Sequence, residues 1–385
     1  MIKYPEYERS ILSVASSVLK HFGVSDCPHE TLPEFDKLLE KNYKNVVVML
    51  FDGLGVSALE EHLGENDFLR KNLICPVSSV FPSTTVAATT SITSGLSPLE
   101  SAWLGWDLYF KEIDKTVAVF RNTEQVSREK AADYNVADRF IPVKSIFTRI
   151  EEINGKGSAY CVSPFSEFHS KSVKHICRTV KRLSKKRKRK YIYTYWHQPD
   201  TAMHDFGVKS EQVHEQILEI NREVERLCKK LKNTLVIITA DHGLLDGENL
   251  YLEDYPELSS LLERTPSVEP RALSLFVKDG KENEFRKEFT RIAGDSFRLF
   301  TKEEAFSEDL FGKGVMNKKT DEFIGSFFAV ATGNKSLFLK REERIFKGIH
   351  AGLTEEEMTV PFIAVEKRKN YGKGFFRDKN ADLTK

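Results

Sequence analysis

Three short apolar segments, each followed within a few residues by an aspartate, constrain the fold of this chain most. Asn45–Phe51 (NVVVMLF), residues 191–196 and Thr234–Thr239 (TLVIIT) are continuous runs rich in β-branched or aromatic side chains. Such runs are typical of strands buried on both faces of a parallel sheet. Residues 8–22 and 211–231 carry apolar side chains at helical spacing. The alternation predicts a mostly parallel sheet with helices on both faces.

The stretch from residue 255 to residue 335 differs from the rest, with shorter expected elements and more charge between them. We therefore expect a three-layer α/β/α sandwich formed by residues 1–254 and 336–385. Residues 255–335 are expected to be a smaller inserted α/β lobe, and a candidate cap over the site. The longest unbroken apolar run is residues 46–51, whereas a membrane-spanning helix needs about 20 residues, so we expect no membrane span.

Composition narrows the expected location and partners. The formal net charge of +1 gives no global reason to expect a nucleic-acid or membrane partner. The five cysteines are odd in number and widely spaced, which argues against a disulfide framework and favours a reducing compartment. The N-terminal stretch mixes acidic and basic residues and lacks a small-residue cleavage site. We therefore expect a cytoplasmic protein.

The aspartates beyond the three strands are the first candidate site residues. Ligands of parallel sheets collect beyond the carboxyl ends of the strands, so the three strands should bring their aspartates to one edge. Histidines accompany them, and the combined set is Asp52, Asp200, His204, Asp241, His242 and His350. Three carboxylates packed together would repel one another, and divalent cations remove that repulsion. Mixed Asp and His ligands suit Zn²⁺, with Mn²⁺ and Fe²⁺ as alternatives, and two ions would suit an in-line displacement.

A candidate nucleophile lies at the start of the helix expected at Thr85–Ser94, which Gly95 should end. The free N–H groups and the dipole of a helix N-terminus favour an anion such as phosphate. A threonine hydroxyl there could attack phosphorus once a metal lowers its pKa. Without metal ligands, the same hydroxyl would more often be a simple helix cap.

Five segments of the chain resemble the alkaline phosphatase superfamily, most closely its nucleotide pyrophosphatase/phosphodiesterase branch. They are MLFDGLG, FPSTTVAATTSITSGLSP, QPDTAMHDFG, IITADHG and GIHAGLTEEEM, and they fall within residues 45–362. The resemblance implies an alkaline phosphatase-like fold and a hydrolase that depends on two metal ions. It also implies that one metal is held by Asp52, Asp241, His242 and Thr85, and the other by Asp200, His204 and His350. The family nucleophile precedes the glycine of an SGL-like stop by ten residues, which selects Thr85 over Thr84.

Two positions depart from the pattern of the branch. The branch usually has TFPN at the nucleophile, where this chain has TVAA from Thr85 onward. It also places an asparagine about 21 residues later to contact a phosphoryl oxygen, where this chain has Trp106. The indole could donate a hydrogen bond, stack on a base or aromatic leaving group, or simply pack in the core or a lid. These departures bear on the substrate and leave the metal chemistry intact.

The sequence thus predicts a hydrolase of phosphodiester or nucleotide pyrophosphate bonds that forms a phosphothreonine intermediate on Thr85. No arginine lies in an obvious motif to hold the extra charge of a monoester. The expected substrate is a small phosphorylated molecule, with a nucleotide as one option. Phosphomonoesterase, phosphonate hydrolase and metal-dependent phosphomutase activities remain alternatives within the superfamily.

A nucleic-acid-binding protein is the alternative from another class. Residues 171–190 hold eleven Lys or Arg and no acid, with apolar residues at helical spacing. The basic face of such a helix could contact phosphates. Before Tyr191, the segment holds no aromatic ring other than that of His175, so a base-stacking platform is missing. We therefore interpret the segment as a solvated basic face, and expect neither a nucleic-acid nor a membrane partner.

Overall fold

The main sheet contains all three strands that the sequence predicts. The computed structural model describes residues 1–341 and 345–368. Six strands lie in the order β2 (Leu73–Ser78), β17 (Thr359–Lys367), β8 (Thr234–Thr239), β1 (Asn45–Phe51), β7 (Lys190–Trp196) and β6 (Ala159–Val162). β8, β1, β7 and β6 are parallel, and β17 runs antiparallel to β8 and β2. β1 has the apolar sequence expected of a strand covered on both faces, and every one of its side chains is buried.

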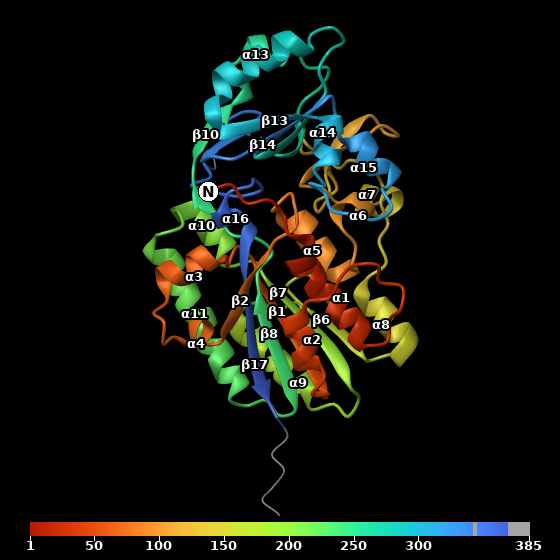
Figure 1. Cartoon of the computed structure of the whole chain (residues 1–385), viewed down its shortest axis with the longest axis vertical. Helices are drawn as coiled ribbons and strands as arrows, with labels where there is room; N and C mark the ends of the chain where they lie inside the picture. Colours follow the sequence, from red (N-terminus) through yellow and green to blue (C-terminus); the bar gives the residue numbers. More distant parts are fainter. Residues whose placement is uncertain (342–344, 369–385) are drawn as a thin grey trace, which may run out of the picture.

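Helices cover both faces of this sheet, so the expected three-layer α/β/α sandwich is confirmed (Figure 1). One layer contains α1 (Ile11–His21), α2 (Pro33–Leu39), α5 (Thr85–Ser94) and α8 (Ile146–Asn154). The other contains α3 (Val56–His62), α4 (Phe68–Lys71), α9 (Val173–Ser184), α10 (Asp200–Phe206) and α11 (Glu211–Cys228). Their apolar faces join the strands in one large core.

A second, antiparallel sheet lies beyond the carboxyl edge of the first (Figure 1). Its order is β13 (Phe297–Thr301), β14 (Phe327–Ala331), β12 (Ala272–Leu275), β11 (Ser267–Glu269), β3 (Asp107–Phe110), β4 (Lys115–Ala118) and β5 (Thr123–Glu124). The helices of this part of the chain are α6 (Pro98–Ser101), α7 (Val136–Phe140), α12 (Pro256–Ser260), α13 (Glu282–Ala293), α14 (Lys302–Ser307) and α15 (Lys318–Phe323).

The second sheet draws strands from two separate parts of the chain. Four strands come from the lobe expected at residues 255–335, and β3, β4 and β5 come from residues 107–124. The lobe boundaries at residues 255 and 335 stay a prediction, and residues 369–385 of the expected core lie outside the described residues. Two small sheets complete the fold, β10 (Glu248–Tyr251) with β15 (Lys335–Phe338) and β9 (Leu245–Asp246) with β16 (Gly348–Ile349).

A buried ion pair joins the second sheet to the main core. Nε of Arg271, next to β12, donates to Glu357 Oε1 at 2.7 Å, and Glu357 lies on α16 (Glu355–Met358). Glu357 also accepts from the backbone N–H of Gly352, at 2.7 Å. This pair anchors the loop that carries His350, because both partners are buried and hydrogen-bonded. Among the described residues, no helix combines the length and apolar character that crossing a bilayer requires.

Candidate active site

The carboxyl edge of the main sheet gathers the predicted aspartates. Asp52 follows β1, Asp241 follows β8 after one residue, and Asp200 begins α10 just beyond β7. All three side chains are buried. Gly53 makes this approach possible, because its φ is +73° and a Cβ there would lie 2.9 Å from Cβ of Asp200. The parallel pairing of β1 with β8 thereby brings Asp52 and Asp241, which are nearly 190 positions apart, into one site.

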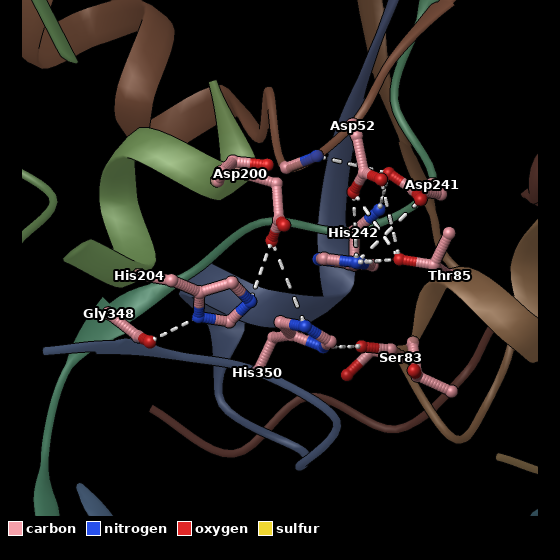
Figure 2. Close-up of polar contacts among 12 residues, drawn as sticks. Asp52, Ser83, Thr85, Asp200, His204, Asp241, His242, Gly348 and His350 are labelled. Atoms are coloured by element: carbon pink, nitrogen blue, oxygen red, sulfur yellow. Dashed lines mark hydrogen bonds and ion pairs between the residues drawn. The ribbon is translucent and has the colours of Figure 1, made fainter. Parts of the chain in front are cut away.

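The first cluster surrounds the hydroxyl of Thr85. Its Oγ1 lies 3.4 and 3.5 Å from the two carboxylate oxygens of Asp52 and 3.3 Å from Nε2 of His242 (Figure 2). Asp241 Oδ1 accepts from the backbone N–H groups of Gly53 and His242, each at 3.1 Å. Ligand atoms of Asp52, Asp241 and His242 all lie within 4.8 Å of one another, which suits one metal ion.

The second cluster surrounds Asp200. Nε2 of His204 lies 3.2 Å and Nε2 of His350 lies 3.8 Å from Asp200 Oδ1 (Figure 2). Ligand atoms of Asp200, His350 and His242 fall within 4.8 Å of one another, so His242 borders both clusters. Its ring stacks on that of His350 with centroids 3.8 Å apart. The structure therefore brings together all seven residues that the sequence predicts as ligands or nucleophile, and their roles stay predictions.

The three histidines of the site use the same ring nitrogen, Nδ1, to contact the backbone. Each has its Nδ1 atom against a backbone carbonyl: His204 on Gly348 at 2.7 Å, His242 on Gly243 at 3.1 Å and His350 on Ser83 at 3.1 Å. A carbonyl can only accept, so Nδ1 carries the proton in each ring. The Nε2 lone pairs therefore point into the site, which is the arrangement of metal-ligating histidines.

The electrostatics of the site fit divalent cations. Burial, together with the charges of Asp241 and Asp200, raises the pKa of Asp52 well above its usual value. The facing histidines lower the pKa of Asp200 despite its burial. Asp200 Oδ1 and Asp241 Oδ2 are buried and accept no hydrogen bond. Buried carboxylate oxygens that accept no hydrogen bond are costly, and metal ions between them and the histidine Nε2 atoms would compensate for this cost.

The site opens into a cavity of about 430 Å³ between the two sheets. Its lining includes four of the predicted site residues, Thr85, Asp200, His204 and His350. It also includes the aromatic residues Trp106, Tyr251, Phe338 and Phe346. Trp106, the residue that departs from the branch pattern, thus lines the cavity. The other neighbouring tryptophan, Trp103, is buried, and its Nε1 donates to the carbonyl of Ile141 at 2.9 Å, which is a packing role.

Comparison with known families agrees with this geometry. A family model described as type I phosphodiesterase / nucleotide pyrophosphatase matches residues 46–353, well over half of the chain. The chain belongs to this family. A search among curated proteins finds no significant match.

Solved structures similar to this family member share its fold. Murine ectonucleotide pyrophosphatase / phosphodiesterase 5 superposes with a TM-score of 0.65 at 17% identity, covering 84% of this chain and 90% of that one. An inactive form of the same murine protein was solved in complex with AMP. Phosphonoacetate hydrolase from Sinorhizobium meliloti 1021 gives a TM-score of 0.59 at 15% identity, covering 86% of this chain and 92% of that one. These likenesses establish the fold.

Tyr195 and Glu269 are among the residues of this site that were not predicted from the sequence. The hydroxyl of Tyr195, at the end of β7, donates to Asp52 Oδ2 (β7 otherwise looks like a plain buried strand). Burial and the charge of Asp52 raise the pKa of Tyr195. Glu269, at the end of β11, lines the cavity, and burial raises its pKa to about 7. The position of Tyr195 at a strand end was a usable signal, whereas nothing local to Glu269 links it to the site.

Proposed function

We propose that this protein is a metal-dependent hydrolase of phosphodiester or nucleotide pyrophosphate bonds that forms a phosphothreonine intermediate on Thr85. One observation carries the proposal: Thr85 Oγ1 lies at the N-terminus of α5, 3.3 to 3.5 Å from Asp52 and His242, on the wall of the cavity. A hydroxyl placed against two potential ligands of one ion, beside free helix N–H groups, suits attack on phosphorus.

The residues divide the work as follows. Thr85 Oγ1 attacks phosphorus and forms a P–O bond, while the bond to the leaving oxygen breaks and that oxygen departs with the electron pair. Water then hydrolyses the phosphothreonine and restores the hydroxyl. Asp52, Asp241 and His242 would hold one ion, and Asp200, His204 and His350 the other. When bound, the ions supply positive charge that lowers the pKa of the Thr85 hydroxyl and offsets the charge of the phosphoryl group.

The finer parts of the proposal concern substrate, metal and location. The aromatic residues of the cavity lining, Trp106 among them, suit a flat base or aromatic leaving group. The AMP bound to the murine protein supports a nucleotide. The mixed Asp and His set favours zinc, with Mn²⁺ or Fe²⁺ as alternatives. Five free cysteines are consistent with a cytoplasmic location.

The test is turnover of bis-p-nitrophenyl phosphate and p-nitrophenyl phosphate by the zinc-loaded protein, with and without EDTA. We expect faster, EDTA-sensitive cleavage of the diester. Preference for the monoester would instead identify the protein as a phosphomonoesterase. Activity on neither, with metal bound, would direct the search to phosphonates and to phosphomutase chemistry, in which isomers interconvert without release of phosphate.

The covalent step has its own test. Thr85→Ala should abolish turnover and the acid-stable phosphoprotein seen after rapid quenching, whereas Thr85→Ser, which keeps a hydroxyl, should retain both in part. Full turnover by Thr85→Ala would overturn the covalent mechanism while leaving the hydrolase activity standing.

A further inference from the structure

The residue before the nucleophile does not cap the nucleophile's helix. Thr84 is the N-cap of α5, yet its side chain accepts no hydrogen bond from the first turn. Its Oγ1 instead donates to Oε1 of Glu269 at 2.7 Å. Four other helices of similar or greater length have a serine as N-cap, and each of these serines accepts a hydrogen bond from the first turn of its helix. They are Ser10 before α1, Ser145 before α8, Ser172 before α9 and Ser210 before α11.

The withdrawn cap leaves the start of α5 open. The backbone N–H groups of Thr85, Val86 and Ala87 have no acceptor among the described residues, and the first helical bond is made by Ala88 to the carbonyl of Thr84, at 2.9 Å. Val86 and Ala87 are fully buried. Unpaired N–H groups at a buried helix N-terminus favour an anion, and a capping hydroxyl would compete with it.

Glu269 is the acceptor of the Thr84 hydroxyl. It belongs to β11 of the second sheet, and its Oε1 accepts both from Thr84 and from the backbone N–H of Trp106, at 2.8 Å. Thr84 is 2% exposed, and the contact of its hydroxyl is with Glu269 rather than with the first turn of its own helix. The second sheet thereby contacts the residue that precedes α5.

We propose that Glu269 is a positioning residue, which keeps the Thr84 hydroxyl off the first turn of α5 so that its N–H groups stay open to a phosphoryl oxygen. This inference rests on the proposed function, because it assigns those N–H groups to the phosphoryl group that Thr85 attacks. A capping hydroxyl is worth about 1 kcal/mol to a helix, so its return should weaken phosphoryl binding about 5- to 10-fold.

The experiment is a rescue series on the zinc-loaded protein. Glu269→Ala frees the Thr84 hydroxyl to cap α5, and we expect kcat/KM on the diester and affinity for inorganic phosphate to fall about 5- to 10-fold. Adding Thr84→Val removes the hydroxyl and should restore most of both. The Trp106 N–H stays unpaired in the single and the double variant, so any recovery must act through Thr84.

Glu269→Gln supplies the conservative control, because its Oε1 still accepts from Thr84 and Trp106, and it should recover most of the loss. Glu269→Asp, one methylene shorter, repeats the test if the alanine variant fails to fold. A double variant as impaired as Glu269→Ala, or a glutamine variant as impaired as the alanine variant, would overturn the proposal. Calorimetric binding of phosphate decides this role even where Thr85→Ala has overturned the covalent mechanism.

Discussion

The two edges of the main sheet both crowd like charges, but they solve the problem differently. At the carboxyl edge, Asp52, Asp200 and Asp241 converge and are buried. At the amino edge, Lys190 begins β7, Lys44 precedes β1, and the basic run from residue 185 to residue 190 leads into β7. The pKa values of the buried members respond in opposite directions: that of Asp52 is raised and that of Lys190 is lowered to about 8.

The two edges differ in whether their buried charged atoms make hydrogen bonds. Nζ of Lys190 donates to Asn45 Oδ1 at 3.0 Å and to the carbonyl of Lys186 at 2.9 Å. Oδ2 of Asp241 and Oδ1 of Asp200 are buried and accept no hydrogen bond. At the amino edge, groups of the chain itself satisfy the buried ammonium of Lys190. At the carboxyl edge, the buried carboxylate oxygens would be satisfied only by a bound ligand of opposite charge.

The exposed cations need no ligand either. Residues 185–189 are exposed, and within residues 1–341 and 345–368 none of the eleven basic residues of 171–190 pairs with a carboxylate. Water solvates such charges at little cost, and salt screens their repulsion. Like-charge crowding therefore indicates a binding site where it is buried and unsatisfied, and a solvated face where it is exposed.

Removing a carboxylate from the incomplete edge should have the largest effect. Asp241→Asn keeps an acceptor for the N–H groups of Gly53 and His242 but removes a negative charge from the proposed metal-binding cluster. We expect turnover to fall by more than about 100-fold, since even partners that only orient metal ligands cost 10–100-fold. The metal-free variant should melt at a higher temperature than metal-free wild type, because a buried carboxylate has been removed.

Asp246→Asn is the matched control for that measurement. Asp246 lies on β9, outside both clusters, and accepts from the N–H of Val208 at 2.7 Å. Its turnover should stay within about two-fold of wild type, as for ordinary substitutions away from a site. Equal losses in the two variants would show that the carboxyl edge is not distinguished by its unsatisfied carboxylates.

The pH dependence of the metal-free protein should show the second effect. The folded state raises the pKa of Asp52, so above the usual pKa of an aspartate the unfolded chain binds fewer protons than the folded one. The stability contributed by this group therefore falls as the pH rises. The total loss is about 1.4 kcal/mol for each unit by which folding raises the pKa. We therefore expect the free energy of unfolding of Asp52→Asn, measured with urea in EDTA, to exceed that of wild type by a margin that grows from pH 5 to pH 8. A constant difference between the two would contradict the raised pKa.

The amino edge should show a slope of the opposite sign. Burial and the neighbouring Lys44 and Lys186 lower the pKa of Lys190 from 10.5 to about 8. Between these values the unfolded chain binds more protons, so stability from this group rises with pH. Wild type should gain stability relative to Lys190→Met as the pH is raised from 7 to 10, measured by denaturant unfolding. Because both Nζ hydrogen bonds are satisfied, the gain should be smaller than the change at Asp52.

Local patterns predicted the carboxyl edge well. The bounds of β1, β8 and α5 match the sequence expectation, because a continuous β-branched run and a left-handed glycine, Gly95 with φ of +76°, are signals within one short segment. Parallel strands then fix where Asp52 and Asp241 must meet.

The remainder depends on contacts between distant segments. β3 joins the second sheet through a single register pair, Asp107 with Val268, and its four residues carry too little periodicity to show it. Glu269 reaches Thr84 across 185 positions of sequence, and no pattern around either residue indicates that contact. The second sheet and its contact with the start of α5 therefore could not be predicted from the sequence.

Neutralising the exposed basic run should have the smallest effect. In a variant with Lys185→Gln, Arg187→Gln and Lys188→Gln, we expect turnover within about two-fold of wild type and an unfolding free energy within about 0.5 kcal/mol, as for surface substitutions. The matching measurement is binding to random-sequence DNA across a salt series. Tight binding by wild type, with a steep salt dependence that the variant loses, would show that this edge too has a ligand. Exposure alone would then no longer separate a solvated face from a binding site, and burial of unsatisfied atoms would identify only the tighter of two sites.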